Sequence, residues 1–191
     1  MISCGFDPNS PAKSFFRKEA ARRLSALTEE EIIAGNEAIT GRVLKHPAYR
    51  NAKCIFTYVS CGRESDTRRI LADALAAGKC VCVPRSLPGG QMEICRIRDL
   101  SELTASRFGI PEPPEGTPTV SRDTVDLALI PCVAANRAGL RLGHGGGYYD
   151  RFLEGFSGTS LLLCREALIF GHIPSEAHDR LCTELITDAS E

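Results

Sequence analysis

Two short apolar runs on either side of a helix-forming segment constrain the fold of this chain most strongly. Residues 53–59 (KCIFTYV) and 80–84 (CVCVP) are rich in apolar and β-branched residues, as buried strands are. Between them, residues 67–77 (TRRILADALAA) follow Asp66, which can cap a helix, and precede Gly78, which can end one. Because a strand–helix–strand unit makes a crossover connection, the two strands are predicted to pair in parallel.

Further apolar runs extend this unit into a larger sheet. Strands are predicted at residues 92–97 (MEICRI), 126–131 (DLALIP), 160–164 (SLLLC) and 184–187 (ELIT), with a short helical patch at residues 100–104. Residues 108–118 contain four prolines, so no regular structure is expected there. The predicted fold class is α/β, a single three-layer domain with a mostly parallel central sheet covered by helices.

The first 46 residues are predicted to form a helical region that precedes an α/β body at residues 47–191. Ser10 and Pro11 resemble the start of a helix, because proline is favoured at the first helical position. Residues 28–31 (TEEE) match the capping-box pattern that opens a second helix. A length of 191 residues suits one domain that comprises both parts.

Composition and charge exclude several classes of protein. The net charge of −1 argues against general binding to nucleic acid or anionic membranes, since both require a basic excess. No apolar run approaches the roughly 18 residues of a membrane span, and the polar residues 1–11 lack the apolar core of a secretory signal. The nine cysteines show no C-x-x-C pair and no zinc-type spacing. We therefore expect reduced, structural thiols and a cytoplasmic location.

A glycine-rich stretch after the strand at residues 126–131 is the most informative feature for function. Residues 143–147 (GHGGG) lead into a helical segment that starts near Tyr148. Ligands of open α/β sheets bind beyond the carboxyl ends of strands, where glycine N–H groups and a helix N-terminus can approach an anion. Arg141 adds a charge with two-pronged geometry. We interpret the stretch as a phosphate-binding loop, although it matches neither the P-loop nor the dinucleotide pattern and a ligand-free turn is the alternative.

Asp150 lies just inside the helical segment that follows the glycines. A carboxylate beside a phosphate is unfavourable unless a cation lies between them, and Mg²⁺ is commonly held by one or two carboxylates together with phosphate oxygens. Aspartate is also favourable near any helix N-terminus, with no metal involved. The residues alone leave both interpretations open.

Residues 141–150 (RLGHGGGYYD), followed by Arg151, resemble the Arg-Leu-Gly-x-Gly-x-Gly-Tyr-Tyr-Asp signature of the 5-formyltetrahydrofolate cyclo-ligase family. The resemblance extends to residues 13–17 (KSFFR), 64–67 (ESDT), 109–113 (GIPEP) and 173–179 (IPSEAHD). It implies a Rossmann-like, CoA-transferase-like fold. It also implies the ATP- and Mg²⁺-dependent conversion of 5-formyltetrahydrofolate to 5,10-methenyltetrahydrofolate, with release of ADP and phosphate.

The resemblance also implies roles for individual residues. Arg141 and Tyr148 would be catalytic, and Asp150 and Asp179 would bind the metal. The implied ATP-binding residues are Lys13, Arg17, Arg141, Leu142, Gly143, His144, Gly145, Gly146, Gly147, Tyr148 and Tyr149. The implied folate-binding residues are Val59, Glu64, Gly145, Gly147 and Tyr148. Without the resemblance, Lys13 and Arg17 also fit an ordinary solvated helix face, and His178–Asp179 an ordinary surface pair.

Residues 134–136 (AAN) depart from the Ala-Phe-Asp that is usual in the family, and the lost Phe volume affects the expected folate side. Two other functions therefore stay open: an ATP-dependent ligase or kinase acting on another small acid, and a non-catalytic folate-binding module. In each case we expect small-molecule partners, no nucleic acid, no membrane and a monomeric protein.

Overall fold

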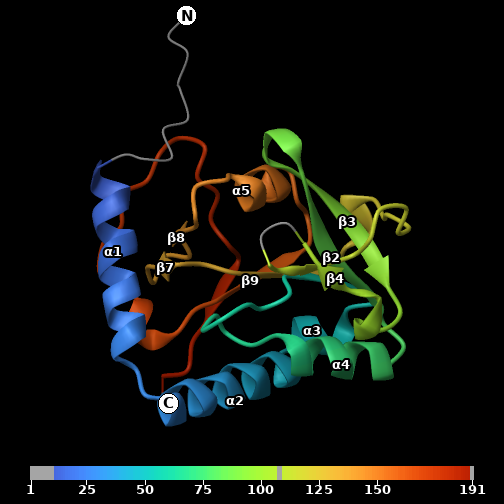
Figure 1. Cartoon of the computed structure of the whole chain (residues 1–191), viewed down its shortest axis with the longest axis horizontal. Coiled ribbons are helices and arrows are strands. Elements are labelled where there is room, and N and C mark those ends of the chain that lie inside the picture. The colour runs from blue at the N-terminus through green and yellow to red at the C-terminus, as the bar shows by residue number, and fades with distance from the viewer. Residues whose placement is uncertain (1–10, 107–108, 190–191) are drawn as a thin grey trace, which may run out of the picture.

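A six-stranded sheet with the strand order β10-β9-β6-β1-β2-β3 forms the centre of the computed structural model, which describes residues 11–106 and 109–189 (Figure 1). Its strands are β1 (Cys54–Thr57), β2 (Cys80–Leu87), β3 (Gln91–Ile97), β6 (Leu127–Ile130), β9 (Thr159–Leu163) and β10 (Glu184–Ile186). Every neighbouring pair is parallel except β2 and β3, which are antiparallel. The prediction of a mostly parallel sheet is thus confirmed.

The predicted strand–helix–strand unit consists of β1, α4 (Arg68–Ala76) and β2. Its helix starts differently from the prediction, because Thr67 rather than Asp66 is the N-cap residue and makes no side-chain cap bond. The Asp66 carboxylate instead accepts a hydrogen bond at 3.1 Å from the backbone N–H of Arg68. It therefore supports the first turn from one position earlier. Gly78 follows the end of the helix as predicted, with a φ of 72° that favours glycine.

The proline-rich segment contains regular structure where none was expected. Pro111–Glu112 forms β5, which pairs antiparallel with β4 (Thr104–Ala105) in a separate two-stranded sheet. Such a ribbon tolerates proline because the missing N–H can lie on the unpaired side. The predicted helical patch is only a 3₁₀ turn, η2 (Leu100–Glu102). Phe108 lies outside the described residues.

The N-terminal region is helical as predicted, with α1 (Pro11–Ala26) and α2 (Glu29–Lys45) followed by the short α3 (Pro47–Asn51). The capping box is present, since the Thr28 hydroxyl accepts from the Glu31 N–H at 3.2 Å and the Glu31 carboxylate accepts from the Thr28 N–H at 2.7 Å. The predicted capping residue Ser10 lies outside the described residues.

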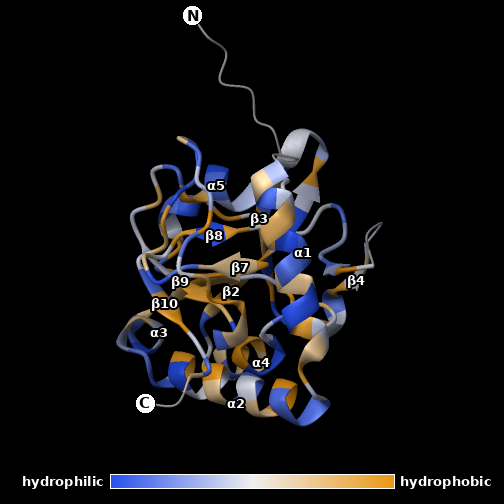
Figure 2. Cartoon of the chain, turned by 90° about the vertical axis from the view of Figure 1, so that its left-hand side faces the viewer, coloured by the Kyte–Doolittle hydropathy of each residue, from blue (hydrophilic) through white to orange (hydrophobic). Residues whose placement is uncertain are grey.

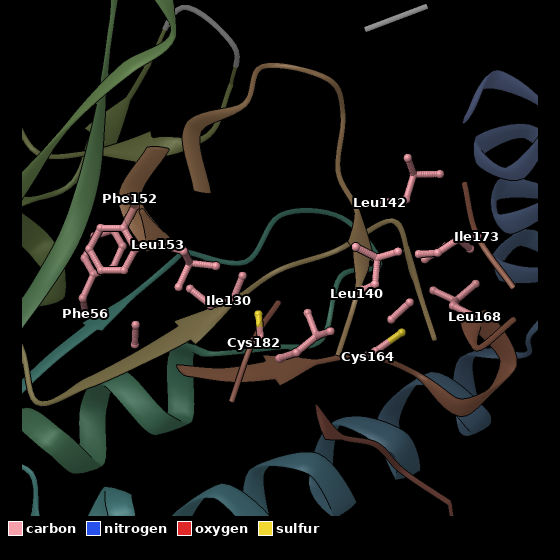
Figure 3. Packing of buried hydrophobic residues seen from close by; sticks show 14 of the residues in the cluster. Phe56, Ile130, Leu140, Leu142, Phe152, Leu153, Cys164, Leu168, Ile173 and Cys182 are labelled. Carbon is pink, nitrogen blue, oxygen red and sulfur yellow. The ribbon is translucent and has the colours of Figure 1, made fainter. Parts of the chain in front are cut away.

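Helices cover both faces of the sheet, and each face has its own apolar core. Ile55 of β1 packs with side chains of α2, α3 and α4 on one face. Phe56, the next residue, points to the other face, where its ring centroid lies 4.7 Å from that of Phe152 in α5 (Tyr148–Leu153) (Figure 3). All four residues of β1 are buried, as expected for a central parallel strand. The three-layer arrangement follows from these two cores.

Figure 2 shows the same layering by hydropathy, with apolar central strands and helices that combine apolar and polar residues. Among the described residues, no helix has the length and apolar character needed to cross a membrane. The remaining elements are the hairpin strands β7 (Ala134–Ala135) and β8 (Arg141–Leu142) and the 3₁₀ turns η1 (Pro88–Gly90), η3 (Arg122–Thr124) and η4 (Glu166–Leu168).

Candidate functional site

A cavity opens at the carboxyl end of β6, between α1, the glycine loop and the segment that precedes β10. It is lined by Lys13, Arg17, Glu64, Pro131, Cys132, Val133, Arg141, Leu142, Gly143, His144, Gly145, Gly146, Gly147, Tyr148, Tyr149, Asp150, Glu176, His178 and Asp179. This position beyond a strand end is where open α/β sheets bind ligands. The cavity therefore collects residues from five separate parts of the sequence.

The β7–β8 hairpin carries the glycine loop, and Asn136 shapes its turn. The side-chain oxygen of Asn136 accepts hydrogen bonds from the backbone N–H groups of Ala138 at 3.0 Å and Leu140 at 3.1 Å. An aspartate oxygen could accept the same bonds, so Asn136 preserves the turn despite its departure from the family pattern. Ala135 is fully buried and bridges to Ile169, so the position of the usual Phe lies in the core.

Glycine is required at two positions of the loop. Gly147 is the N-cap residue of α5 and adopts a φ of 67°, which a residue with a side chain rarely adopts. At Gly146 a Cβ atom would lie 2.5 Å from the ring of Tyr148, so a side chain there would displace that ring. At these two positions the loop thus presents backbone rather than side chains to the cavity.

Lys13 projects from α1 into this cavity and is almost fully buried, with 6% of its surface exposed. Its ammonium group lies 2.9 Å from a carboxylate oxygen of Asp179 and 3.5 Å from one of Glu176. The same Asp179 carboxylate accepts a hydrogen bond from the Glu176 N–H at 2.7 Å. Lys13 therefore does not belong to an ordinary solvated helix face, and Asp179 does not belong to an ordinary surface pair.

Arg17 lies one helical turn after Lys13 and contacts the glycine loop directly. Its Nε–H donates to the carbonyl oxygen of Gly143 at 2.8 Å. The two cations that the sequence placed on one helix face thus reach opposite sides of the cavity, since Lys13 contacts the segment at Glu176–Asp179.

Arg141 and Asp150 form a second ion pair, between a buried guanidinium and a half-buried carboxylate, with an N–O distance of 2.7 Å. A second guanidinium nitrogen of Arg141 donates to the carbonyl oxygen of Arg180 at 2.6 Å, and the Arg180 N–H donates to Asp150 at 3.1 Å. Both predicted metal-binding carboxylates therefore already have a basic partner: Arg141 for Asp150 and Lys13 for Asp179. A metal ion would have to share or displace those partners.

The chemistry of this donor set nevertheless fits Mg²⁺. Asp150 and Asp179 both line the cavity, and Mg²⁺ typically takes one or two carboxylates, leaving its other positions to water and phosphate oxygens. No thiol or imidazole of the kind that selects softer metals is needed. The residues thus permit magnesium without showing where it would lie.

Glu64 lines the cavity from the loop after β1. Burial raises the pKa of its carboxyl group, and a hydrogen bond from the Cys61 N–H at 2.8 Å partly offsets that effect. Burial also raises the pKa of Tyr149, whose ring lies 6.4 Å from that of Phe56. This side of the cavity is less polar than the side formed by the ion pairs.

Val59 is the one predicted site residue that the cavity does not include. Its side chain is buried in the core that packs against α2, α3 and α4. Conversely, the lining residues that the sequence interpretation missed are Pro131, Cys132, Val133, Glu176 and His178. Position offered a signal for the first three, because Pro131 ends a predicted strand and Cys132 and Val133 directly follow it.

Arg165 is a further residue that sequence reasoning missed. It is 1% exposed, and its guanidinium donates to the carbonyl oxygens of Arg63 and Glu64, both at 3.2 Å, and to the side-chain oxygen of Asn36 at 2.7 Å. It therefore anchors the loop that carries Glu64. A single arginine directly after the apolar run SLLLC was the available signal.

The comparisons with known proteins agree on one family. The sequence model of the 5-formyltetrahydrofolate cyclo-ligase family matches residues 9–188. Over 94% of this chain and 95% of the relative, the chain is 29% identical to a mouse protein named 5-formyltetrahydrofolate cyclo-ligase. It is 33% identical to a Caenorhabditis elegans protein named as a probable member, over 74% of this chain and 72% of the relative.

Solved structures give the same result for the fold. The Aquifex aeolicus 5,10-methenyltetrahydrofolate synthetase superposes with a TM-score of 0.82 at 29% identity, covering 93% of this chain and 90% of that one. A synthetase of the same name from Mycoplasma pneumoniae superposes with a TM-score of 0.75 at 19% identity, covering 93% and 99%. The second likeness concerns the fold alone.

Proposed function

The chain belongs to the 5-formyltetrahydrofolate cyclo-ligase family, and on that premise we propose that its cavity uses ATP and Mg²⁺ to convert 5-formyltetrahydrofolate into 5,10-methenyltetrahydrofolate. The observation that carries the proposal is the convergence of Lys13, Arg17 and Arg141 on one glycine-lined cavity that also contains Glu64. Cations and backbone N–H groups suit the phosphates of ATP, whereas a partly buried carboxylate suits a pterin ring rich in N–H donors.

In the proposed reaction the formyl oxygen attacks the γ-phosphorus of ATP, and the bond from that phosphorus to the β,γ-bridging oxygen breaks to release ADP. N10 then adds to the activated formyl carbon and loses its proton, and the C–O bond breaks to release phosphate. Phosphoryl transfer of this kind depends on positioning and charge neutralisation. No nucleophilic side chain is required, so we assign no catalytic role to a cysteine.

The nucleotide side would be formed by Lys13, Arg17, Arg141 and residues 142–149. We propose an exchange of partners, in which phosphate oxygens replace Asp179 at Lys13 and Asp150 at Arg141. The support for this exchange is that each of the two cations forms an ion pair with a carboxylate that also lines the cavity. The exchange would free both carboxylates to hold Mg²⁺, which when bound neutralises phosphate charge.

The folate side would be formed by Glu64, Tyr148, Gly145 and Gly147. The Glu64 carboxylate would accept hydrogen bonds from the pterin, and the Tyr148 hydroxyl would orient the reacting formyl group next to Arg141. Val59 would act indirectly, because it is buried just before the Glu64 loop. We further propose that the enzyme is monomeric and cytoplasmic, and the cytoplasmic location is supported by the eight described cysteines all being free thiols.

Comparing substrates tests this proposal against the alternatives. ADP release would be followed with 5-formyltetrahydrofolate, 10-formyltetrahydrofolate, tetrahydrofolate and a panel of small carboxylic acids. ADP release that requires 5-formyltetrahydrofolate supports the cyclo-ligase. Release with another acid alone would point to a different ligase or kinase, and folate binding without any ADP release would point to a binding module.

A further inference from the structure

Three thiols lie close together at the end of the sheet that is opposite the cavity. Cys54 is the first residue of β1 and Cys80 the first of β2, so both lie at the amino ends of these parallel strands. They face each other directly in the strand register, and Cys82 lies two residues further along on the same side of β2. The cavity, in contrast, opens at the carboxyl end of the neighbouring strand β6.

The three sulfur atoms lie close enough together to share one metal ion. The Sγ atom of Cys82 lies 3.9 Å from that of Cys54 and 3.9 Å from that of Cys80. All three sulfurs lie within 4.8 Å of one another. In the plane of three such sulfurs, the point equidistant from all of them lies at most about 2.5 Å from each sulfur. This distance is close to the roughly 2.3 Å of a thiolate–metal bond.

The backbone holds these thiols in place without a ligand. The N–H of Cys80 donates to the carbonyl oxygen of Lys53 at 2.8 Å, and the N–H groups of Lys53 and Cys54 both donate to the Asp126 carboxylate at 2.8 Å. A preorganised ligand set of this kind does not have to be assembled when an ion binds.

Burial and charge suit a soft, monovalent ion. Cys54 and Cys82 are buried and Cys80 is half-buried, so an ion could enter beside Cys80. Arg96, exposed on β3 directly opposite Cys82, supplies positive charge on the same side of the sheet. In the part of the chain that the structure describes, no fourth Cys, His, Asp or Glu ligand atom lies within 4.8 Å of all three sulfurs. Soft thiolate ligands favour Cu(I) and zinc among metal ions, and zinc prefers a fourth ligand, so the three thiols fit Cu(I) better.

We propose that Cys54, Cys80 and Cys82 form a three-thiolate binding site for Cu(I), separate from the catalytic cavity. Binding releases the thiol protons to solvent and forms three Cu–S bonds, with no change in the oxidation state of sulfur or copper. The bound ion would cross-link β1 and β2 at their amino ends. The spacing of the three cysteines in the sequence does not indicate this site, because the ligands come from two strands that the fold brings side by side.

The test is a titration of the full-length, reduced protein with Cu(I) under nitrogen, in the presence of the competing chelator bathocuproine disulfonate. The matched variants are Cys80→Ser, which changes the half-buried ligand at a strand end, and Cys4→Ser/Cys61→Ser, which removes two other thiols. We expect the wild type and the double variant to retain one equivalent of Cu(I). Cys80→Ser should lose at least about 100-fold in affinity.

X-ray absorption at the copper edge of the wild-type complex should show sulfur ligands only, and this measurement does not depend on any variant folding. Three results would overturn the site: no copper retained against the chelator, equal retention by Cys80→Ser, or loss of copper in the double variant. Formation of a Cys54–Cys80 disulfide in air, without Cu(I) retention under nitrogen, would equally reject it and indicate a redox pair.

Discussion

The guanidinium of Arg141 lies 2.7 Å from the carboxylate of Asp150, and both residues line the cavity next to the glycine loop. The Arg141 side chain is only 4% exposed, so its charge is held in a largely dry environment where it acts strongly. A phosphate that arrives at this pair meets one attractive and one repulsive partner. This relationship is the basis of the proposed exchange from an ion pair to a metal-bridged complex.

Asp150→Asn tests that exchange. The amide keeps the shape of the carboxylate but removes the charge that would hold Mg²⁺, so turnover should fall about 100-fold and require more Mg²⁺. The matched control is Glu154→Gln, which removes a carboxylate from the end of the same helix, where it pairs with Arg180 in solvent. The initial rate across a magnesium titration is the readout. Wild-type rates for Asp150→Asn at every magnesium concentration would rule out a metal role.

Lys13→Met should destabilise the protein as well as weaken ATP binding. The substitution removes the ammonium group beside the Asp179 carboxylate, which is 10% exposed, and we expect this loss to cost about 2–4 kcal/mol in the free energy of unfolding. Lys18→Met on the exposed side of α1 should change it by less than about 0.5 kcal/mol. Urea unfolding measures both.

The double variant Lys13→Met/Asp179→Asn separates stability from function. It should recover much of the lost stability, because the largely buried side chain at position 179 no longer carries a charge and Glu176, the other partner of Lys13, is 31% exposed, yet turnover should stay low. Recovery of turnover together with stability would show that the pair is only structural.

The structure around Asn136 predicts opposite outcomes for two substitutions at that position. Asn136→Asp keeps the oxygen that accepts from Ala138 and Leu140, so the thermal midpoint should stay within a few degrees of the wild type. Asn136→Ala removes both hydrogen bonds and should cost about 1–3 kcal/mol. Thermal unfolding of the two variants side by side decides the matter. Equal midpoints would mean that the hairpin does not depend on this side chain.

How much of the molecule the sequence predicts depends on the range of the interaction. The capping box at Thr28 and the buried strand at Cys54–Thr57 are local patterns, and both occur as predicted. The ion pair between Lys13 and Asp179 joins residues 166 positions apart, and nothing in the helical spacing around Lys13 indicates its burial. Only the fold brings α1 onto the segment before β10.

The site shows the same division. The glycine loop and Arg141 could be identified because they lie together in one continuous stretch of the sequence. For Arg165 the sequence offers only its place after an apolar run, and its role could not be predicted because its partners are carbonyl groups of a distant loop. The prediction for the proline-rich segment was wrong for a different reason. Its strand β5 has only two residues, and it pairs with β4, a contact that the sequence does not show.

The buried Glu64 should make stability depend on pH. Because its folded-state pKa is raised by burial, the neutral form is favoured, and its contribution to stability is fully present below the unfolded pKa of about 4.3. That contribution is lost as the pH rises through the raised folded pKa. As the pH rises from the unfolded to the folded pKa of Glu64, the wild type should therefore lose stability relative to Glu64→Gln. Above the folded pKa the difference in stability should stay constant. Urea midpoints measured across this pH range, with exposed Glu37→Gln as the control, test the sign.

The most direct measurement is the growth of the methenyltetrahydrofolate absorbance band with purified protein, 5-formyltetrahydrofolate, ATP and Mg²⁺. We expect the band to grow with ATP and Mg²⁺ together, to be absent when either is omitted, and to be accompanied by one ADP per methenyl product. No band from a folded protein that still binds ATP and 5-formyltetrahydrofolate would contradict the proposed reaction.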